Sequence, residues 1–251
     1  MKINKIKKEK NKMYRIELEN QTLIVHEEIL LKYEILLKKK INEQEIQSIL
    51  IENKYLTSYY DALKYITKKM RSQKEVQEFL QKKEYNKEEI NRTINRLQKE
   101  KYIDDTAYQE SFIHDKIALT LDGPLLIKRE LAKFGITDTS KVDEIPTKAW
   151  QERVAKIISR RQKSLHKESI NAFKQKLKNY LVVHGYNEEL FMAQLEKLEL
   201  PENLDYIAKE CEKLLAKAQN KDAKTLYQIK GKLYRTGFSQ TDIERGLEEN
   251  L

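Results

Sequence analysis

The chain has 251 residues, of which 39% are hydrophobic and 35% charged, and its single cysteine, Cys211, excludes an intrachain disulfide. No apolar run approaches the roughly 18 residues that a membrane span needs, and the N-terminus lacks the apolar core of a signal peptide, so we expect a cytoplasmic protein. The net charge of +9 favours a polyanionic partner, although a chain that solvates every helix with Lys and Glu has the same composition.

The only strand pattern lies near the N-terminus. Tyr14, Ile16 and Leu18 alternate with polar residues, as in a strand with one buried face. A turn then leads into a returning strand over residues 22–25, and residues 2–6 are a candidate for a third strand. We therefore expect a small β-containing extension at this end of the chain.

Two helices are expected to complete the extension, over residues 27–37 and 43–53. Asn42 is followed three residues later by Glu45, which is the spacing of a capping box. In a capping box each of the two side chains binds the backbone N–H of the other residue. This spacing predicts that the second helix begins at residue 43.

From residue 59 onward the chain repeats itself with a period near 51 residues. Four segments share a leucine that is followed five residues later by an aromatic residue or Ile. The leucines stand 51, 50 and 52 residues apart and are Leu80, Leu131, Leu181 and Leu233. A period held over four copies is the sequence signature of a repeat architecture. We predict that these leucines occupy equivalent buried positions.

Each repeat has room for three helices of ordinary length. Gly135, Gly185 and Gly237 are expected to end the second helix of their repeats, because the residue after a helix often adopts a left-handed conformation that suits glycine. A residue with N-cap chemistry then stands two positions after each of these glycines, and also in the first repeat. These expected N-caps of the third helices are Asn86, Thr137, Asn187 and Ser239.

The predicted fold is mainly all-α, an elongated and curved tandem array of three-helix repeats behind a small N-terminal β-containing extension. A three-helix unit cannot easily bury its apolar faces alone, so neighbouring repeats are expected to stack. The extension would span residues 1–58, and the repeats would span residues 59–103, 104–148, 149–200 and 201–251. Two departures are expected. Glu84 replaces the glycine in the first repeat, so its helix needs another ending, and Pro146 shortens the third helix of the second repeat.

The sequence contains no recognisable catalytic pattern. It has no phosphate-binding Gly-rich loop, no nucleophile elbow and no zinc-protease motif. The four histidines are dispersed, and the Asp104–Asp105 pair stands before a helix, where a capping role is favoured over metal binding. We therefore expect a binding protein with no catalytic residues, no metal and no cofactor.

The strongest binding signal is a set of basic residues on successive repeats. If equivalent helices face the same side, these residues form one stripe, although solvated helix faces are the simpler interpretation of any single residue. The candidate partner- or DNA-binding residues are Lys128, Arg129, Lys133, Arg160, Arg161, Lys163, Lys174, Lys178, Lys230 and Arg235. Many of the 14 tyrosines stand at apolar helix positions, so base-stacking platforms are not implied.

The segment KYIDDTAYQESFIHDK, followed by DGPLLIKRELAKFGI, resembles the RecX family of regulatory proteins. In that family an aromatic-hydrophobic-Asp-Asp segment opens one helix, and a Gly-Pro pair opens the next. The matching residues are Tyr102, Ile103, Asp104, Asp105, Tyr108, Gly123, Pro124, Leu131 and Gly135. The tandem three-helix units and the strand-rich N-terminal extension also fit the family's longer members, so the resemblance covers nearly the whole chain.

The resemblance implies regulation without catalysis. RecX-like proteins bind the RecA recombinase filament, lie in its helical groove on single-stranded DNA, and inhibit or modulate its ATPase and strand exchange. We expect a monomer that binds this filament, with single-stranded DNA contacted directly or through it, and that does not bind membranes. Two other classes remain open at this point: a basic helical-repeat protein that binds nucleic acid directly, and a scaffold for another acidic partner.

Overall fold

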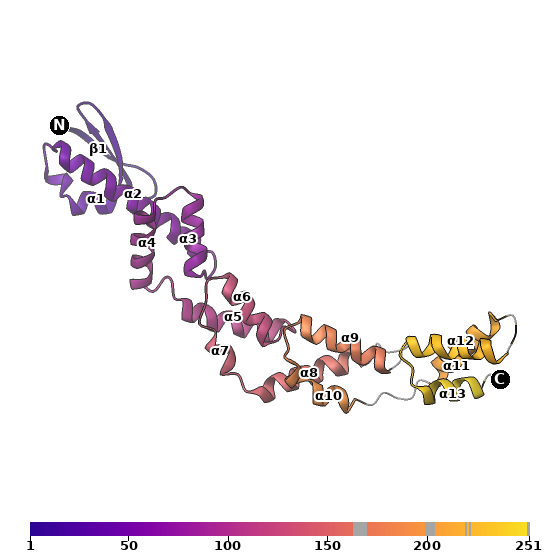
Figure 1. Cartoon of the computed structure of the whole chain (residues 1–251). Helices are drawn as coiled ribbons and strands as arrows, with labels where there is room; N and C mark the ends of the chain where they lie inside the picture. Colours follow the sequence, from indigo (N-terminus) through magenta and orange to yellow (C-terminus); the bar gives the residue numbers. More distant parts are fainter. Residues whose placement is uncertain (163–169, 199–203, 219, 221, 250–251) are drawn as a thin grey trace. The chain divides into compact units, whose positions relative to one another are not determined.

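The computed structural model is mainly helical, with one small sheet at the N-terminus, as the sequence predicted (Figure 1). It describes residues 1–162, 170–198, 204–218, 220 and 222–249. The chain divides into two compact units. The first comprises residues 1–111 with 133–136, and the second comprises residues 112–132 with 137–251.

The N-terminal sheet has three antiparallel strands in the order β1 (Ile3–Lys8), β2 (Met13–Leu18) and β3 (Thr22–His26). In the central strand, Ile16 pairs with Ile6 on one side and with Leu23 on the other. Ile16 is fully buried, as expected for an apolar residue of the alternating pattern that predicted the strand. All three predicted strands are confirmed.

The first helical segment is shorter than predicted. The helix expected over residues 27–37 ends early, as α1 (Glu27–Lys32), and a 3₁₀ turn, η1 (Ile35–Leu37), follows it. Between them Glu34 adopts a left-handed backbone with φ of +48°. This break allows Ile35 to enter the core, where it is fully buried.

The second helix is longer than predicted. It begins at the expected capping box of Asn42 and Glu45, but as α2 (Glu43–Ile66) it continues well beyond residue 53. No Gly or Pro interrupts residues 54–66. Its first half packs with the sheet, whereas Tyr59 and Ala62 lie in the core of the following three-helix segment. One continuous helix therefore crosses residue 58, and the boundary proposed there remains a prediction.

Helical segments follow one another in threes along the rest of the chain. The first helices are α2, α5 (Asp105–Leu119), α8 (Thr147–Gln162) and α11 (Leu204–Ala216). The second helices are α3 (Gln73–Lys82), α6 (Pro124–Lys133), α9 (Ile170–Val183) and α12 (Ala223–Arg235). The third are α4 (Lys87–Lys99), α7 (Ser140–Asp143), η2 (Glu188–Leu190) with α10 (Met192–Glu196), and α13 (Gln240–Glu248). Each second helix carries one of the periodic leucines, and all four leucines are at most 1% exposed.

A left-handed residue ends every second helix. Gly135, Gly185 and Gly237 have φ of +85°, +82° and +89°, which confirms the conformation predicted for them. Glu84 at the corresponding place in the first repeat has φ of +63°. The expectation that this helix ends by another device was therefore wrong, because a non-glycine residue adopts the same conformation there.

The third helices follow the predicted N-caps only in part. Asn86 and Ser239 form complete capping boxes with Glu89 and Asp242. Thr137 does not cap a helix, because the four-residue α7 begins only at Ser140 and ends before Pro146. Asn187 precedes a 3₁₀ turn and makes no side-chain capping bond.

The second and third repeats meet through direct backbone contact. The N–H of Gly123 donates to the carbonyl oxygen of His184 at 2.7 Å, and the N–H of Leu125 donates to the carbonyl oxygen of Gly185 at 3.0 Å. The end of α9 thus supplies acceptors to unpaired donors at the start of α6. A Cβ added to Gly185 would lie 2.3 Å from the backbone nitrogen of Leu126, so this approach requires glycine.

A related contact joins the first and second repeats. The Nζ of Lys74, at the start of α3, donates to the carbonyl oxygen of Lys133 at 2.9 Å. A Cβ added to Gly135 would lie 2.9 Å from the Cβ of Lys74. In both junctions the end of a second helix therefore abuts the start of the second helix of the preceding repeat.

Candidate partner-binding surface

The third repeat presents two adjacent arginines at the end of α8. Arg160 and Arg161 are both exposed. The guanidinium of Arg161 lies 3.5 Å from the ring centroid of Tyr180 on α9, and the Tyr180 ring packs in turn on His184 at 4.1 Å. Such cation–π stacking holds a guanidinium in place while its edge remains suited to bind carboxylate or phosphate. Arg161 is therefore a predicted basic residue whose guanidinium is held against an aromatic ring.

The predicted lysines of α9 are partly engaged within their own repeat. The Nζ of Lys178 lies 3.0 Å from a carboxylate oxygen of Glu188, and the Nζ of Lys174 donates to the carbonyl oxygen of Glu196 at 3.3 Å. Both lysines are half-buried. In the structure these two lysines connect α9 to η2 and to α10.

The basic residues of α6 divide in the same way. Lys128 forms an ion pair with Asp143 at 2.6 Å, which links α6 to the short α7. The Asp143 side chain is 65% exposed, and exposed ion pairs of this kind contribute only about 0–1 kcal/mol, so a stronger anion displaces them easily. Arg129 and Lys133 are exposed.

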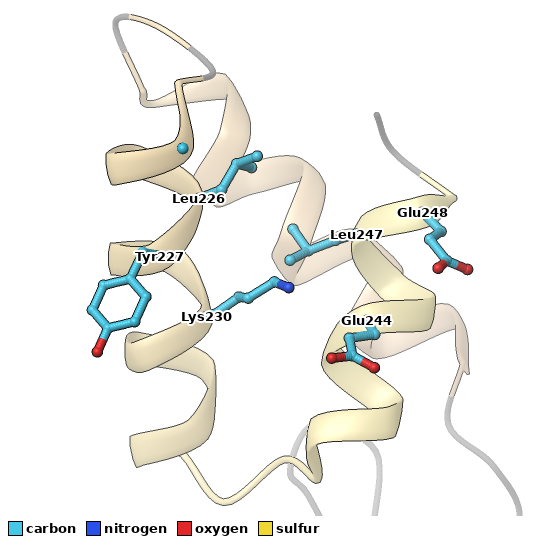
Figure 2. Close-up of a pocket in the computed structure, with 7 residues that line it drawn as sticks. Leu226, Tyr227, Lys230, Glu244, Leu247 and Glu248 are labelled. Atoms are coloured by element: carbon cyan, nitrogen blue, oxygen red, sulfur yellow. The ribbon is translucent and has the colours of Figure 1, made fainter.

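In the fourth repeat, Lys230 and Arg235 are exposed on α12. Lys230 lines a groove of about 340 Å³ between α12 and α13, with an apolar floor that includes Leu226 and Leu247 (Figure 2). Glu244 lies across the groove on α13. The tenth candidate, Lys163, lies outside the described residues.

Two exposed tyrosines on α12 were not predicted from the sequence. Tyr227 and Tyr234 on α12 are 79% and 67% exposed, although tyrosines were expected mainly at packed positions. Their spacing of seven residues around Gly231 places them on one helix face, and this is the signal that could have revealed them. The buried side of the same helix is instead formed by Ile229 and Leu233.

A half-buried ionic cluster joins α5 to α6 and to the segment before it. Lys116 on α5 pairs with Glu130 and, at 2.9 Å, with Asp122. Burial alone would raise the pKa of Asp122, but the hydrogen bond and charge of Lys116 outweigh it and hold that pKa below its usual value. Arg153 donates to the carbonyl oxygens of Ile117 at 2.6 Å and Thr120 at 2.7 Å and thereby anchors α8 to the end of α5. Lys116 and Arg153 therefore stabilise the packing of these helices.

A second ionic network joins the N-terminal extension to the first repeat. Glu28 on α1 accepts from the Tyr60 hydroxyl at 2.6 Å and from Arg96 at 3.2 Å, and the Arg96 guanidinium lies 3.9 Å from the Tyr59 ring centroid. Burial raises the pKa of Tyr60 to about 12, with a further contribution from its hydrogen bond to Glu28. Burial lowers the pKa of His26, whose ring stacks on Tyr60. This network positions α1 against the first repeat.

The Asp104–Asp105 pair caps helices, as predicted. Asp104 accepts from the backbone N–H of Thr106 at 2.9 Å at the start of α5, and Asp105 accepts from the N–H of Gln73 at 2.8 Å at the start of α3. Within the described part of the chain, no group of three His, Cys, Asp or Glu residues is placed to hold a metal ion. Cys211 is fully buried in the core of the fourth repeat.

None of the helices in the described ranges combines the length and apolar character needed to cross a membrane.

Residues 59–97, which comprise the end of α2 with α3 and most of α4, match the family model described as the first three-helix domain of RecX.

Full-length relatives extend this match to most of the chain. A protein of Oceanobacillus iheyensis named regulatory protein RecX is 31% identical over 90% of this chain and 87% of its own length. A protein of the same name from Halalkalibacterium halodurans is 32% identical over 90% of this chain and 88% of its own length. A crystal structure of regulatory protein RecX, 20% identical, covers 97% of this chain and 98% of its own with a TM-score of 0.51, which supports the fold. The chain belongs to the RecX family of regulatory proteins.

Proposed function

We propose that this protein binds the filament that RecA recombinase forms on single-stranded DNA, lies in its helical groove, and inhibits or modulates its ATPase and strand exchange. Family membership carries this proposal, since the relatives over nearly the whole chain are named regulatory proteins. The protein would act in the cytoplasm as a monomer, without catalysis of its own and without a cofactor.

The contact surface we propose is the basic face of the second and third repeats. Arg129 on α6 and Arg160 on α8 are exposed, and Arg161 is held on the Tyr180 ring. Lys128 and Lys178 would exchange their exposed partners, Asp143 and Glu188, for phosphates or acidic side chains of the filament. The remaining candidates, Lys133, Lys163, Lys174, Lys230 and Arg235, would extend this face.

A salt titration of two complexes tests the proposal. Binding to assembled filament and to bare single-stranded DNA is measured between 50 and 200 mM salt, where six to ten phosphate contacts would weaken affinity by about 10³–10⁵. If RecA itself supplies the main contacts, binding to the filament falls much less steeply. The expected results are tighter binding to filament than to bare strand, and inhibition of the RecA ATPase.

The test variant changes Arg160 and Arg161 to Ala. If both arginines contact phosphates, the log–log salt slope should become shallower by about 1.4, since each single-strand phosphate contributes about 0.7. A matched control changes Lys87 and Lys99, two exposed lysines of α4, to Ala and removes the same charge. Equal affinity for filament and bare strand, with no effect on RecA, would favour direct nucleic-acid binding. No binding to either would favour another acidic partner.

A further inference from the structure

One exposed face of α12 carries two tyrosines around a glycine. Tyr227 and Tyr234 are 79% and 67% exposed, and Gly231 lies between them on the same side of the helix. Seven residues of helix rise about 10 Å, so the two rings stand two turns apart. Figure 2 shows the Tyr227 ring directed away from α13, although Tyr227 is also one of the residues that line the groove between α12 and α13.

Packing does not explain the glycine. A Cβ added to Gly231 would meet nothing within 4 Å, and its backbone is not among those with positive φ. Glycine destabilises the interior of an exposed helix relative to alanine, so nothing in the fold favours it here. A bare backbone between two exposed rings instead allows close approach of a flat group.

The surrounding charge selects the kind of partner. The helix contains no acidic residue, and its cations are Lys224, Lys230, Lys232 and Arg235. The Nε of Arg235 donates to the carbonyl oxygen of Gly231 at 3.2 Å, which holds a guanidinium beside the glycine. Glu244 and Glu248 line the far wall of the groove, so a polyanion would approach from the side of Lys224 and Arg235.

We propose that this face of α12 binds single-stranded nucleic acid directly, with bases stacked on Tyr227 and Tyr234 and phosphates beside the flanking cations. Exposed aromatic rings among cations are the recurring feature of surfaces that bind unpaired strands without reading their sequence. A duplex, whose bases are already stacked, does not fit this face. The inference deepens the proposed function by assigning a contact with single-stranded nucleic acid to the fourth repeat. It rests on the proposed function only for which nucleic acid is bound in the cell.

The test is a fluorescence-anisotropy titration of the full chain without recombinase. The probes are a labelled oligothymidylate, the same oligomer with abasic sugars, a matched oligouridylate and a duplex. Loss of one base–aromatic stack should raise the Kd for oligothymidylate by about 5- to 150-fold, so we expect this from Tyr227→Ala and from Tyr234→Ala. The abasic oligomer and the duplex should bind more weakly than oligothymidylate. The uridylate arm shows whether the face distinguishes DNA from RNA, and binding of either unpaired strand supports the proposal.

Two further variants separate stacking from loss of fold. Tyr102→Ala removes a tyrosine that is 49% exposed elsewhere in the chain and should leave the Kd unchanged. Gly231→Ala should weaken strand binding although its melting temperature equals or exceeds that of the wild type. The proposal is overturned if the abasic oligomer binds as tightly as oligothymidylate, or if both tyrosine variants bind the strand like the wild type. Loss of filament binding alone in those variants would mean that this face contacts protein instead.

The two proposals fail separately. If the tyrosine variants inhibit the RecA ATPase normally and the wild type does not bind bare strand, only the assignment to α12 is wrong. If the wild type binds bare strand through these tyrosines but leaves RecA activity unchanged, only the proposed regulation is wrong.

Discussion

Replacing Gly185 with alanine probes the backbone junction between the second and third repeats. Gly185 has φ of +82°, and an added Cβ would lie 2.3 Å from the backbone nitrogen and 2.6 Å from the Cβ of Leu126. A left-handed residue with a Cβ costs about 1–2 kcal/mol. Forcing the packed segments apart adds about 1–3 kcal/mol. We therefore expect Gly185→Ala to lower the free energy of unfolding by about 2–5 kcal/mol.

Two other glycines provide controls of graded severity. Gly135 has nearly the same φ, +85°, but the three atoms nearest its added Cβ belong to the Lys74 side chain, the closest being the Lys74 Cβ at 2.9 Å. Gly135→Ala should therefore cost the left-handed strain of about 1–2 kcal/mol and a shift of Lys74, and less in total than Gly185→Ala. Gly231 meets nothing, so Gly231→Ala should stabilise the protein by up to about 1 kcal/mol.

Urea unfolding of the full chain, followed by far-UV circular dichroism, measures this order. Midpoints are compared at constant m-value, because a changed slope would indicate a change in cooperativity rather than in stability. The same samples are checked for unchanged helical content before unfolding. A loss in Gly185→Ala no larger than in Gly135→Ala would refute the close backbone approach, because displacing the Leu126 backbone would then cost no more than displacing the Lys74 side chain.

Three further predictions follow from the cores and caps. Leu181→Ala, at a fully buried position of the third repeat, should cost about 2–5 kcal/mol in the same unfolding assay, and a loss within error would contradict its burial. Glu84→Gly should stabilise the protein by about 1 kcal/mol, because Glu84 holds a left-handed φ of +63°, and a decrease in stability would show that its side chain contributes more than the strain costs. Burial lowers the pKa of His26, so the unfolded chain binds the proton more tightly and stability should fall as pH drops below about 6.5. His26→Gln should reduce that dependence between pH 7 and 5, and an unchanged profile would refute the assignment to His26.

The sequence predicted those features that depend on nearby residues. Alternation around Ile16 located the central strand, and Asn42 with Glu45 located the start of α2, because both patterns act within a few residues. The 51-residue period located the second helices and their left-handed ends. These local preferences agree with the fold, and for that reason the elements they specify can be predicted from the sequence.

Features that depend on distant residues were missed. The end of α2 is set by two cores that share one helix. The lack of Gly and Pro in residues 54–66 permits the helix to continue but does not fix where it ends. The basic residues looked alike in sequence, yet Lys128 finds Asp143 fifteen residues away and Arg161 finds the ring of Tyr180 on the next helix. Tertiary packing decides which partner each basic side chain has. The number and spacing of Lys and Glu residues in the sequence do not reveal it.

The exceptional residue of the first repeat follows from the same geometry. Gly135 and Gly185 each end a helix and also lie against the start of the second helix of the preceding repeat. The sheet, α1 and η1 precede the first repeat instead, and Glu84 is exposed at its left-handed turn. The strain alone is small enough for a charged residue to occupy the position, whereas a side chain at Gly185 would collide with the Leu126 backbone and one at Gly135 with Lys74. The missing glycine is therefore the expected consequence of being at the start of the array, and a turn that packs against no neighbouring helix should tolerate substitution.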